Sequence, residues 1–590
     1  MIQRLTALAL LLGSVTTAQS AERSLSDFED YARTKLPGLS DAQLKSFAKA
    51  VDTDGDGKIS DEEFAARSKA LRSLRQRPAP AKKNAETTDT KGEARQKTQP
   101  VSVPFPASVK PELLLITHES TANAWLPFAE WKTQHGKPTK IVTVGQIAAK
   151  YQAKSIQEKI RLCVREHIER DEIRWVLLGG DCLPGDRPAE EQGLVPGGHI
   201  TVHAQEPKGI PTDIVYLSPT TGDADADVII GEWKDDRDAI VYPDGTVGLG
   251  RVPVRTAADI AAFTEKVIAY ESKYPTTDFA QKMVYTCTEK HAYPKVLQSW
   301  DGFLSKSWKD GSVQRFFSHQ TPWDAEGKPG SYDLSPKNFV KLINEGSTGK
   351  LHIHGHGHLP SWVLEGSQFG AKQVAKLSNA GAYPLITTVS CNTGEYDSAT
   401  DPSIVERMIR KPKGGSVAIV APIRTGKPHF AKRSDFRLMI TEGKLDGTTQ
   451  TMTRYWVNGL KGSGRTTGEA LMKAKAQMAD DAKMSPNYHL CISEINLLGD
   501  PTLDMRARAA KDLRVQAPKS ISTGKQDIEI STGVAFASVC VWKGEELYTI
   551  GDADGEGKAS IQVDVKTPGT MTLGVYGKSL NSVTTTIEVR

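Results

Sequence analysis

Cysteine is scarce in this chain, with six residues among 590, and none of them stands in a CxxC pair or at a zinc-like spacing. This scarcity argues against a dense disulfide framework and against structural zinc, although the number allows one or two disulfides. Net charge is also small, at +4, and gives no reason to expect nucleic acid as a partner. No apolar run reaches the ~20 residues that a membrane-spanning helix requires.

The first residues are typical of an export signal. Met1 to Arg4 carries a positive charge, residues 5–12 are mostly apolar, and small residues follow up to Ala21. This order predicts a signal peptide over residues 1–20, cleaved after Ser20. We therefore expect an exported protein that is secreted, periplasmic or at the cell surface and has no transmembrane span.

Composition divides the rest of the chain into four parts. Residues 21–75 read as a small helical module, and 76–110 as a disordered linker, because 76–100 hold no aromatic or branched aliphatic side chain. Buried strands alternate with amphipathic helices over 111–508, which predicts an α/β domain whose mostly parallel sheet has helices on both faces. Short alternating strands over 512–590 predict an immunoglobulin-like β-sandwich.

The segment from residue 52 to residue 63 has the spacing of an EF-hand calcium loop. Positions one, three, five, seven and twelve of that loop fall on Asp52, Asp54, Asp56, Lys58 and Glu63. Gly57 stands at position six, where the loop must turn sharply, and Lys58 contributes only its backbone carbonyl oxygen. A solvated acidic turn would not place a glycine and a glutamate in this register, so we expect Ca²⁺ as a ligand.

Two other short segments carry reactive side chains. An apolar run ends in alternating histidines over residues 352–358, and a second apolar run ends at Cys391. The end of a strand is where a parallel sheet presents its chemistry. A thiol beside an imidazole supplies a nucleophile and its proton carrier, which indicates a cysteine hydrolase. Gly357 follows His356 and lets its own backbone N–H approach a developing oxyanion.

Two other functions stay open on this evidence. In a continuous strand, the four histidines 352–358 would share one face and could hold zinc, as in a metal-dependent hydrolase. Against this, Gly355 and Gly357 would interrupt the strand, and no acidic ligand follows closely. The other function is that of a catalytically inactive calcium-binding surface protein. Its EF-hand or β-sandwich would bind a cell-surface or matrix partner.

The two reactive segments resemble those of the gingipain family of cysteine peptidases, which has a caspase-like fold. The resemblance lies in Gly355-His356-Gly357 with Trp362 six residues after the histidine, and in Ser390-Cys391 followed by residues 392–396. It extends from about residue 112 to residue 505 through the blocks 177–181, 250–254 and 496–503. The EF-hand is not a feature of that family.

The resemblance implies a secreted cysteine endopeptidase that acts on polypeptide substrates. It assigns Cys391 as the nucleophile, His356 as the general acid and base, and the backbone N–H groups of Gly357 and Cys391 as the oxyanion hole. Family members that cleave after arginine or lysine hold an acidic residue in the substrate pocket. Our pocket candidates in this chain are Asp301, Glu395 and Trp362, with Asp213 and Asp244 as weaker ones.

Overall fold

The computed structural model describes residues 101–182, 194–200, 209–222, 236, 244–288, 302, 304, 306–317, 334–364, 367–398, 402–426, 447–461 and 465–590, together with 23–24 and 58–59. The chain divides into two units, residues 1–97 and 98–590. In the first unit, β1 (Arg23–Ser24) pairs antiparallel with β2 (Lys58–Ile59). The predicted signal peptide, the linker residues 76–100 and the calcium loop apart from Lys58–Ile59 lie outside the described residues.

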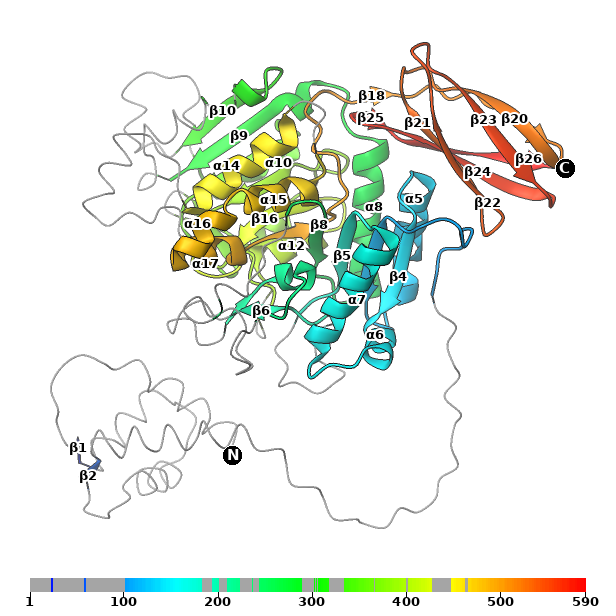
Figure 1. Ribbon diagram of the computed structural model, residues 1–590. Coiled ribbons are helices and arrows are strands. Elements are labelled where there is room, and N and C mark those ends of the chain that lie inside the picture. The colour runs from blue at the N-terminus through cyan, green and yellow to red at the C-terminus, as the bar shows by residue number, and fades with distance from the viewer. Residues whose placement is uncertain are drawn as a thin grey trace, which may run out of the picture. The chain divides into compact units, whose positions relative to one another are not determined.

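Ten strands of the described residues form one large sheet in the second unit (Figure 1). Their order is β10-β9-β11-β15-β16-β17-β8-β5-β3-β4. In that order the strands are Ser312–Phe317, Lys282–Cys287, Lys350–His354, Leu385–Thr388, Ala418–Pro422, Ile495–Gly499, Gly248–Val252, Trp175–Gly179, Leu113–Thr117 and Thr139–Thr143. Neighbours from β10 to β16 are parallel, neighbours from β8 to β4 are parallel, and β17 is antiparallel to β16. The prediction of a mostly parallel α/β sheet is confirmed.

The helices come from the segments between these strands. They are α5 (Leu126–Gln134), α6 (Val144–Lys150), α7 (Ile156–Asp171), α8 (Ala257–Ser272), α10 (Pro336–Asn344), α11 (Ala371–Val374), α12 (Ile404–Arg410), α14 (Gly447–Leu460), α15 (Thr467–Ala476), α16 (Ala479–Met484) and α17 (Pro486–Glu494), with the 3-10 turns η1 (Ala122–Trp125), η2 (Asp213–Leu217) and η3 (Asp278–Gln281). Hydroxyl side chains define several of the starts. Thr256 and Ser403, for example, begin α8 and α12 with capping boxes. Among the described helices, none has the length and apolar character needed to cross a membrane.

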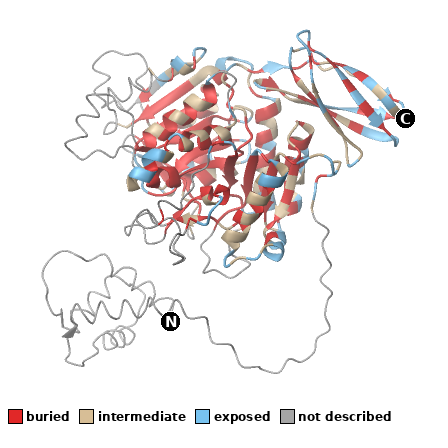
Figure 2. Cartoon of the chain, in the orientation of Figure 1, coloured by how far each residue is buried: buried red, intermediate tan, exposed pale blue. Residues whose placement is uncertain are grey.

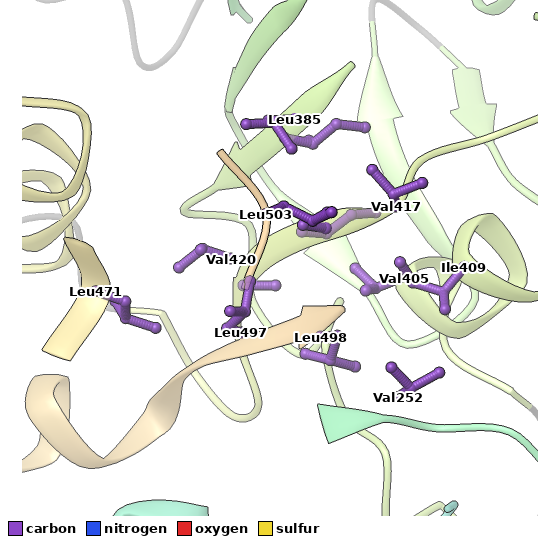
Figure 3. Packing of buried hydrophobic residues seen from close by; sticks show 14 of the residues in the cluster. Val252, Leu385, Val405, Ile409, Val417, Val420, Leu471, Leu497, Leu498 and Leu503 are labelled. Carbon is purple, nitrogen blue, oxygen red and sulfur yellow. The ribbon is translucent and has the colours of Figure 1, made fainter. Parts of the chain in front are cut away.

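The core lies on both faces of the sheet. Every residue of β3, β5, β8, β11, β16 and β17 is buried, so neither face of these strands is open to solvent (Figure 2). Successive side chains of a strand alternate between the faces, so Leu497 and Leu498 of β17 enter different layers. Figure 3 shows Leu471 of α15 on one side of these strands, and Val405 and Ile409 of α12 on the other.

Two small antiparallel sheets accompany the large one. Directly after β11, the strands β12 (Gly357–His358), β13 (Ser361–Leu364) and β14 (Ser367–Phe369) form a meander. Between β5 and β8, the strand β6 (His199–Ile200) pairs with β7 (Ile210–Pro211). Both lie in segments that follow a strand of the large sheet.

The C-terminal region is all-β, as predicted. Its strands are β18 (Lys511–Asp512), β19 (Ser520–Ile521), β20 (Gly524–Ser531), β21 (Ser538–Lys543), β22 (Leu547–Asp552), β23 (Lys558–Val565), β24 (Gly569–Tyr576), β25 (Leu580–Asn581) and β26 (Val583–Val589). A five-stranded sheet, β19-β26-β24-β21-β22, and the pair β20-β23 share a separate core that includes Ile528, Val541, Val563 and Leu573. Its immunoglobulin type stays a prediction.

The predicted linker ends earlier than expected. Val103 is 4% exposed and belongs to the main core. The indole Nε1 of Trp542 donates a hydrogen bond to the carbonyl oxygen of Pro104 at 2.8 Å. Our assignment of residues 101–110 to a disordered linker is therefore wrong. Unlike residues 76–100, this segment has branched aliphatic side chains, Val101 and Val103, which pack against the main core.

Lys266 of α8 ties this helix to the turn that leads into β16. Its side chain is buried, and its three N–H donors are shared among four carbonyl oxygens, those of Ile409 at 2.6 Å, Ser416 at 2.9 Å, Met408 at 3.2 Å and Gly414 at 3.3 Å. Met408 and Ile409 belong to the last turn of α12, whose carbonyls have no partner within the helix. Lys266 thus provides hydrogen-bond donors for the free carbonyl oxygens at the end of α12 and holds this end against α8.

Replacing this lysine tests the tie. Lys266→Met is expected to lower the free energy of unfolding by about 2–4 kcal/mol, because buried carbonyl oxygens lose their donor. Urea denaturation measures the change. Lys273→Met, at the exposed C-cap of the same helix, is the control and should change the value by less than about 0.5 kcal/mol. Equal stabilities of the two variants would show that the tie contributes nothing.

Candidate active site

The pairing of β11 with β15 brings the two reactive segments together. In the parallel register Ile353 matches Thr388, and the N–H of Val389 donates to the carbonyl oxygen of Ile353 at 3.1 Å. Both strands therefore end at the same edge of the sheet. His356 follows three residues after Ile353, and Cys391 follows three residues after Thr388.

Gly357 packs directly against the residues around Cys391. A Cβ atom at position 357 would lie 2.5 Å from Cγ2 of Thr393, 2.7 Å from Cβ of Ser390 and 3.0 Å from the carbonyl oxygen of Cys391. These separations are shorter than carbon atoms tolerate, so the close approach requires a glycine. The turn that carries His356 and the turn that carries Cys391 are thus in backbone contact.

Trp362 supports this contact from the core. It pairs with Gly357 across β12 and β13, and its side chain is fully buried. Its ring centroid lies 5.7 Å from that of Phe369 and 6.4 Å from that of Phe339. Because none of its surface is exposed, Trp362 does not line a substrate pocket, and our assignment of it to the pocket is wrong. Its spacing from His356 reflects the register of the hairpin.

The four alternating histidines separate into two pairs. His352 and His354 are buried, while His356 and His358 are exposed on the turn. Nδ1 of His352 hydrogen-bonds with the hydroxyl of Thr387 at 2.7 Å, and Nδ1 of His354 with that of Tyr285 at 2.7 Å. Burial lowers the pKa of His352 to about 3. In the part of the chain that the structure describes, no three His, Cys, Asp or Glu side chains form a metal-binding group. The zinc alternative therefore lacks a ligand set there.

Cys391 differs from the other cysteines in its exposure. All six lie in the described ranges, none forms a disulfide, and Cys391 alone is not buried. Its thiol donates to the carbonyl oxygen of Gly426 at 3.5 Å. Partial burial raises the pKa of the Cys391 thiol, and the nearby carboxylate of Glu494 raises it further. Both effects favour the protonated thiol over the thiolate in the free protein.

The turn after Cys391 is fixed by Asn392. This residue has a φ of 58°, in the left-handed region that asparagine tolerates better than most residues. Its N–H donates to the carbonyl oxygen of Arg424 at 2.8 Å, and its side-chain amide donates to Oε2 of Glu395 at 3.1 Å. The carboxylate of Glu395, 23% exposed, is thereby fixed within the turn that follows Cys391, with Nη1 of Arg424 at 3.8 Å from Oε1.

The other acidic pocket candidates differ in position. Asp213 is buried, and its two carboxylate oxygens accept hydrogen bonds from Nε and Nη2 of Arg251, both at 2.8 Å. The guanidinium of Arg251 also lies 4.9 Å from the ring centroid of Tyr396. The charge of Asp213 is thus compensated inside the protein. Asp301 lies outside the described residues.

An ion pair beside this turn was missed by the sequence reasoning. Arg424 donates to both carboxylate oxygens of Asp397, at 2.8 Å and 2.6 Å, and Nε2 of His199 in β6 lies 3.9 Å from Oδ2 of Asp397. Burial alone would raise the pKa of Asp397, but the hydrogen bonds from Arg424, with the His199 ring nearby, hold it well below its usual range. No sequence pattern connects positions 397 and 424, so the pair is visible only in the fold.

Alkylation should report the state of the Cys391 thiol. Native protein is expected to take up one equivalent of iodoacetamide, at Cys391, since the other thiols are buried. The raised pKa keeps the thiolate fraction low at neutral pH, so the rate should rise through a midpoint above about 8.5. Stopped-time labelling with mass spectrometry measures the profile, and Cys391→Ala should take up none. A rate that has already levelled off at pH 7 would contradict this.

Comparison with known proteins places this site in a family. The model of peptidase family C25 matches residues 107–506. Gingipain R2 of Porphyromonas gingivalis is 22% identical over 483 residues, which cover 78% of this chain and 55% of that protein. Gingipain R1 of the same organism is 22% identical over 482 residues, which cover 78% of this chain and 41% of that protein. The chain thus spans about half the length, or less, of the curated relatives that it matches.

Solved structures share the fold. The crystal structure of the Arg-specific cysteine proteinase gingipain R matches with a TM-score of 0.58 and 20% identity, over 82% of this chain and 100% of that one. The complex of the Porphyromonas gingivalis RgpB pro- and mature domains matches with a TM-score of 0.58 and 20% identity, over 81% of this chain and 100% of that one. At this identity the likeness establishes the common architecture.

Proposed function

Because this chain belongs to peptidase family C25, a family of cysteine endopeptidases, we propose that it hydrolyses peptide bonds in polypeptides. Cys391 is the proposed nucleophile and His356 the proposed general acid and base. The observation that carries this assignment is the contact of Gly357 with the Ser390–Thr393 turn at one edge of the sheet. It joins the residue after the imidazole to the backbone of the thiol residue.

The proposed reaction has two steps. The sulfur of Cys391 attacks the carbonyl carbon of the scissile bond, and the thiol proton passes to His356, which then protonates the leaving amine. Water, deprotonated by His356, next attacks the thioester, and the sulfur leaves as a thiol. In both steps the oxyanion would accept hydrogen bonds from the N–H groups of Gly357 and Cys391.

For substrate selection we favour Glu395 as the acidic group of the pocket. Its carboxylate is partly exposed and held by Asn392 in the turn that carries Cys391. One solved relative is described as Arg-specific, and the exposed part of this carboxylate, which Arg424 approaches only to 3.8 Å, would pair with an arginine or lysine side chain of the substrate. Asp301 is the other pocket candidate.

Export and calcium binding complete the proposed function. The charged, apolar and small residues of segment 1–20 support removal of a signal peptide and a secreted, periplasmic or surface location. The oxygen-rich spacing from Asp52 to Glu63 supports one Ca²⁺ ion at an EF-hand loop. Either this module or the C-terminal β-domain would then contact a cell-surface or matrix partner.

Substitution at the two strand ends tests the catalytic assignment. Cys391→Ala and His356→Ala should each lower kcat/KM on a mixed peptide library by at least about 1,000-fold, because each removes a group that forms or breaks bonds. His358→Ala, at the exposed end of β12 two residues after His356, should retain activity. The cleavage products also define the residue preferred before the scissile bond.

Two results would favour the alternatives. Activity that survives Cys391→Ala and is abolished by a strong zinc chelator would indicate a metal-dependent hydrolase. A folded wild-type protein that neither cleaves the library nor reacts with a peptidyl thiol probe would indicate an inactive surface protein.

Calorimetry tests the calcium loop in the full chain. Wild-type protein should bind one Ca²⁺, and the double substitution Asp52→Asn with Glu63→Gln should abolish the binding, since two carboxylate ligands become neutral amides. Asp552→Asn, at the end of β22, is the matched control: an acidic run also begins there, but Val563 and not a glutamate stands at its position twelve, so this variant should bind as the wild type does. Unchanged binding in the double variant would show that the ion does not bind at residues 52–63 and would contradict the proposal.

A further inference from the structure

We propose that the Arg424–Asp397 ion pair is a positioning device for catalysis, which holds the turn after Cys391 so that the backbone N–H of Cys391 faces the developing oxyanion. The inference rests on the proposed function, since it concerns the oxyanion hole of that reaction. It adds two residues that do not touch the reacting atoms and that stand far apart in the sequence.

The turn after Cys391 is attached to the end of β16 and to the segment that follows this strand. The N–H of Asn392 donates to the carbonyl oxygen of Arg424 at 2.8 Å, and the N–H of Gly394 donates to that of Pro422 at 2.9 Å. The thiol of Cys391 donates to the carbonyl oxygen of Gly426 at 3.5 Å, and the side chain of Arg424 binds Asp397. The first two attachments are backbone bonds, whereas the Arg424–Asp397 pair is an attachment outside the nucleophile that depends on residue type.

Arg424 acts on both ends of this turn. Its carbonyl oxygen binds the residue directly after the nucleophile, while its guanidinium binds Asp397, six residues beyond the nucleophile. Nη1 of Arg424 also lies 3.8 Å from Oε1 of Glu395. One residue therefore binds the backbone beside Cys391 and orients the carboxylate of Asp397.

The geometry and burial of the pair suit a rigid support. Two parallel hydrogen bonds from a planar guanidinium fix the orientation of a carboxylate, which a lysine ammonium cannot do. The side chains of Arg424 and Asp397 are only 7% and 12% exposed, so water competes little for these bonds. Nε2 of the partly exposed His199 in β6 lies 3.9 Å from Oδ2 of Asp397.

A displaced N–H donor weakens transition-state binding more than substrate binding. Small errors in the placement of catalytic groups cost up to about 100-fold in rate, and loss of an oxyanion donor costs about 100- to 1,000-fold. A nucleophile that keeps its thiol should nevertheless react normally with a small reagent that needs no oxyanion hole. Loss of the ion pair should therefore lower kcat on a peptide and leave the alkylation rate of Cys391 unchanged, whereas a general loss of structure would change both.

The test uses Asp397→Asn, Arg424→Met and Arg424→Lys in the full chain. The first two should lower kcat on a peptide substrate by about 10- to 100-fold with KM changed less than about 3-fold, and should weaken a peptide aldehyde inhibitor by a similar factor. Arg424→Lys, which keeps the charge without the fork, should recover only part of kcat. Alkylation of Cys391 by iodoacetamide should stay within about 3-fold of the wild-type rate in all three.

Arg410→Met is the matched control. Arg410 has the same 12% exposure as Asp397 and pairs with Glu406 at 2.6 Å on α12, so its loss should lower thermal stability without lowering kcat. Unchanged kcat in folded Asp397→Asn and Arg424→Met would overturn the inference, as would a kcat that falls equally in Arg410→Met. A wild-type enzyme that depends on neither Cys391 nor His356 would instead defeat the proposed function itself.

Discussion

The parallel pairing of β11 with β15 is the constraint on which the candidate site depends. Ile353 and Thr388 are matched in register, and His356 and Cys391 each follow their strand's matched residue by three positions. Parallel strands end at one edge, so a thiol and an imidazole that are distant in sequence become neighbours without any covalent link. A shift of this register by one residue would turn the side chains of the shifted strand to the opposite faces of the sheet.

Non-covalent packing then fixes the details that the strands leave open. None of the six cysteines is cross-linked, so the turns are held by contact and hydrogen bonding. Gly357 permits the backbone approach, buried Trp362 anchors the hairpin behind it, and Arg424 with Asp397 holds the opposite turn. The same residues leave Cys391 as the accessible thiol. Local rigidity and nucleophile exposure therefore arise from one arrangement.

Much of this arrangement could be predicted from the sequence because it depends on local pattern. Apolar runs that stop at His356 and Cys391 mark buried strands and their ends, and the alternation of strands with helices predicts the parallel sheet. Trp362 was misassigned because its fixed offset from the histidine fits a pocket wall as well as a core anchor. Only the register of the hairpin and the burial of the side chain separate the two.

Pairs of residues that meet through the fold left no sequence signal. Asp397 and Arg424 lie on different strand-to-helix segments, and each alone resembles a solvated surface charge. Asp213 was a weaker pocket candidate, yet burial against Arg251 compensates its charge. The end of the linker was placed too late, at residue 110. Residues 101–110 contain no helix or strand pattern, and only the tertiary structure, for example the hydrogen bond from Trp542 to Pro104, shows that this segment is part of the fold. Long-range contacts of this kind follow from topology.

A crystal structure of the protein with a peptide aldehyde is the most direct test of the proposed pairing at the sheet edge. The expected result is a thiohemiacetal on Sγ of Cys391, whose oxygen lies about 3 Å from the N–H groups of Gly357 and Cys391, with the His356 ring facing it. An aldehyde bound to any other side chain, or an oxygen directed away from both N–H groups, would contradict the assignment of this edge as the active site.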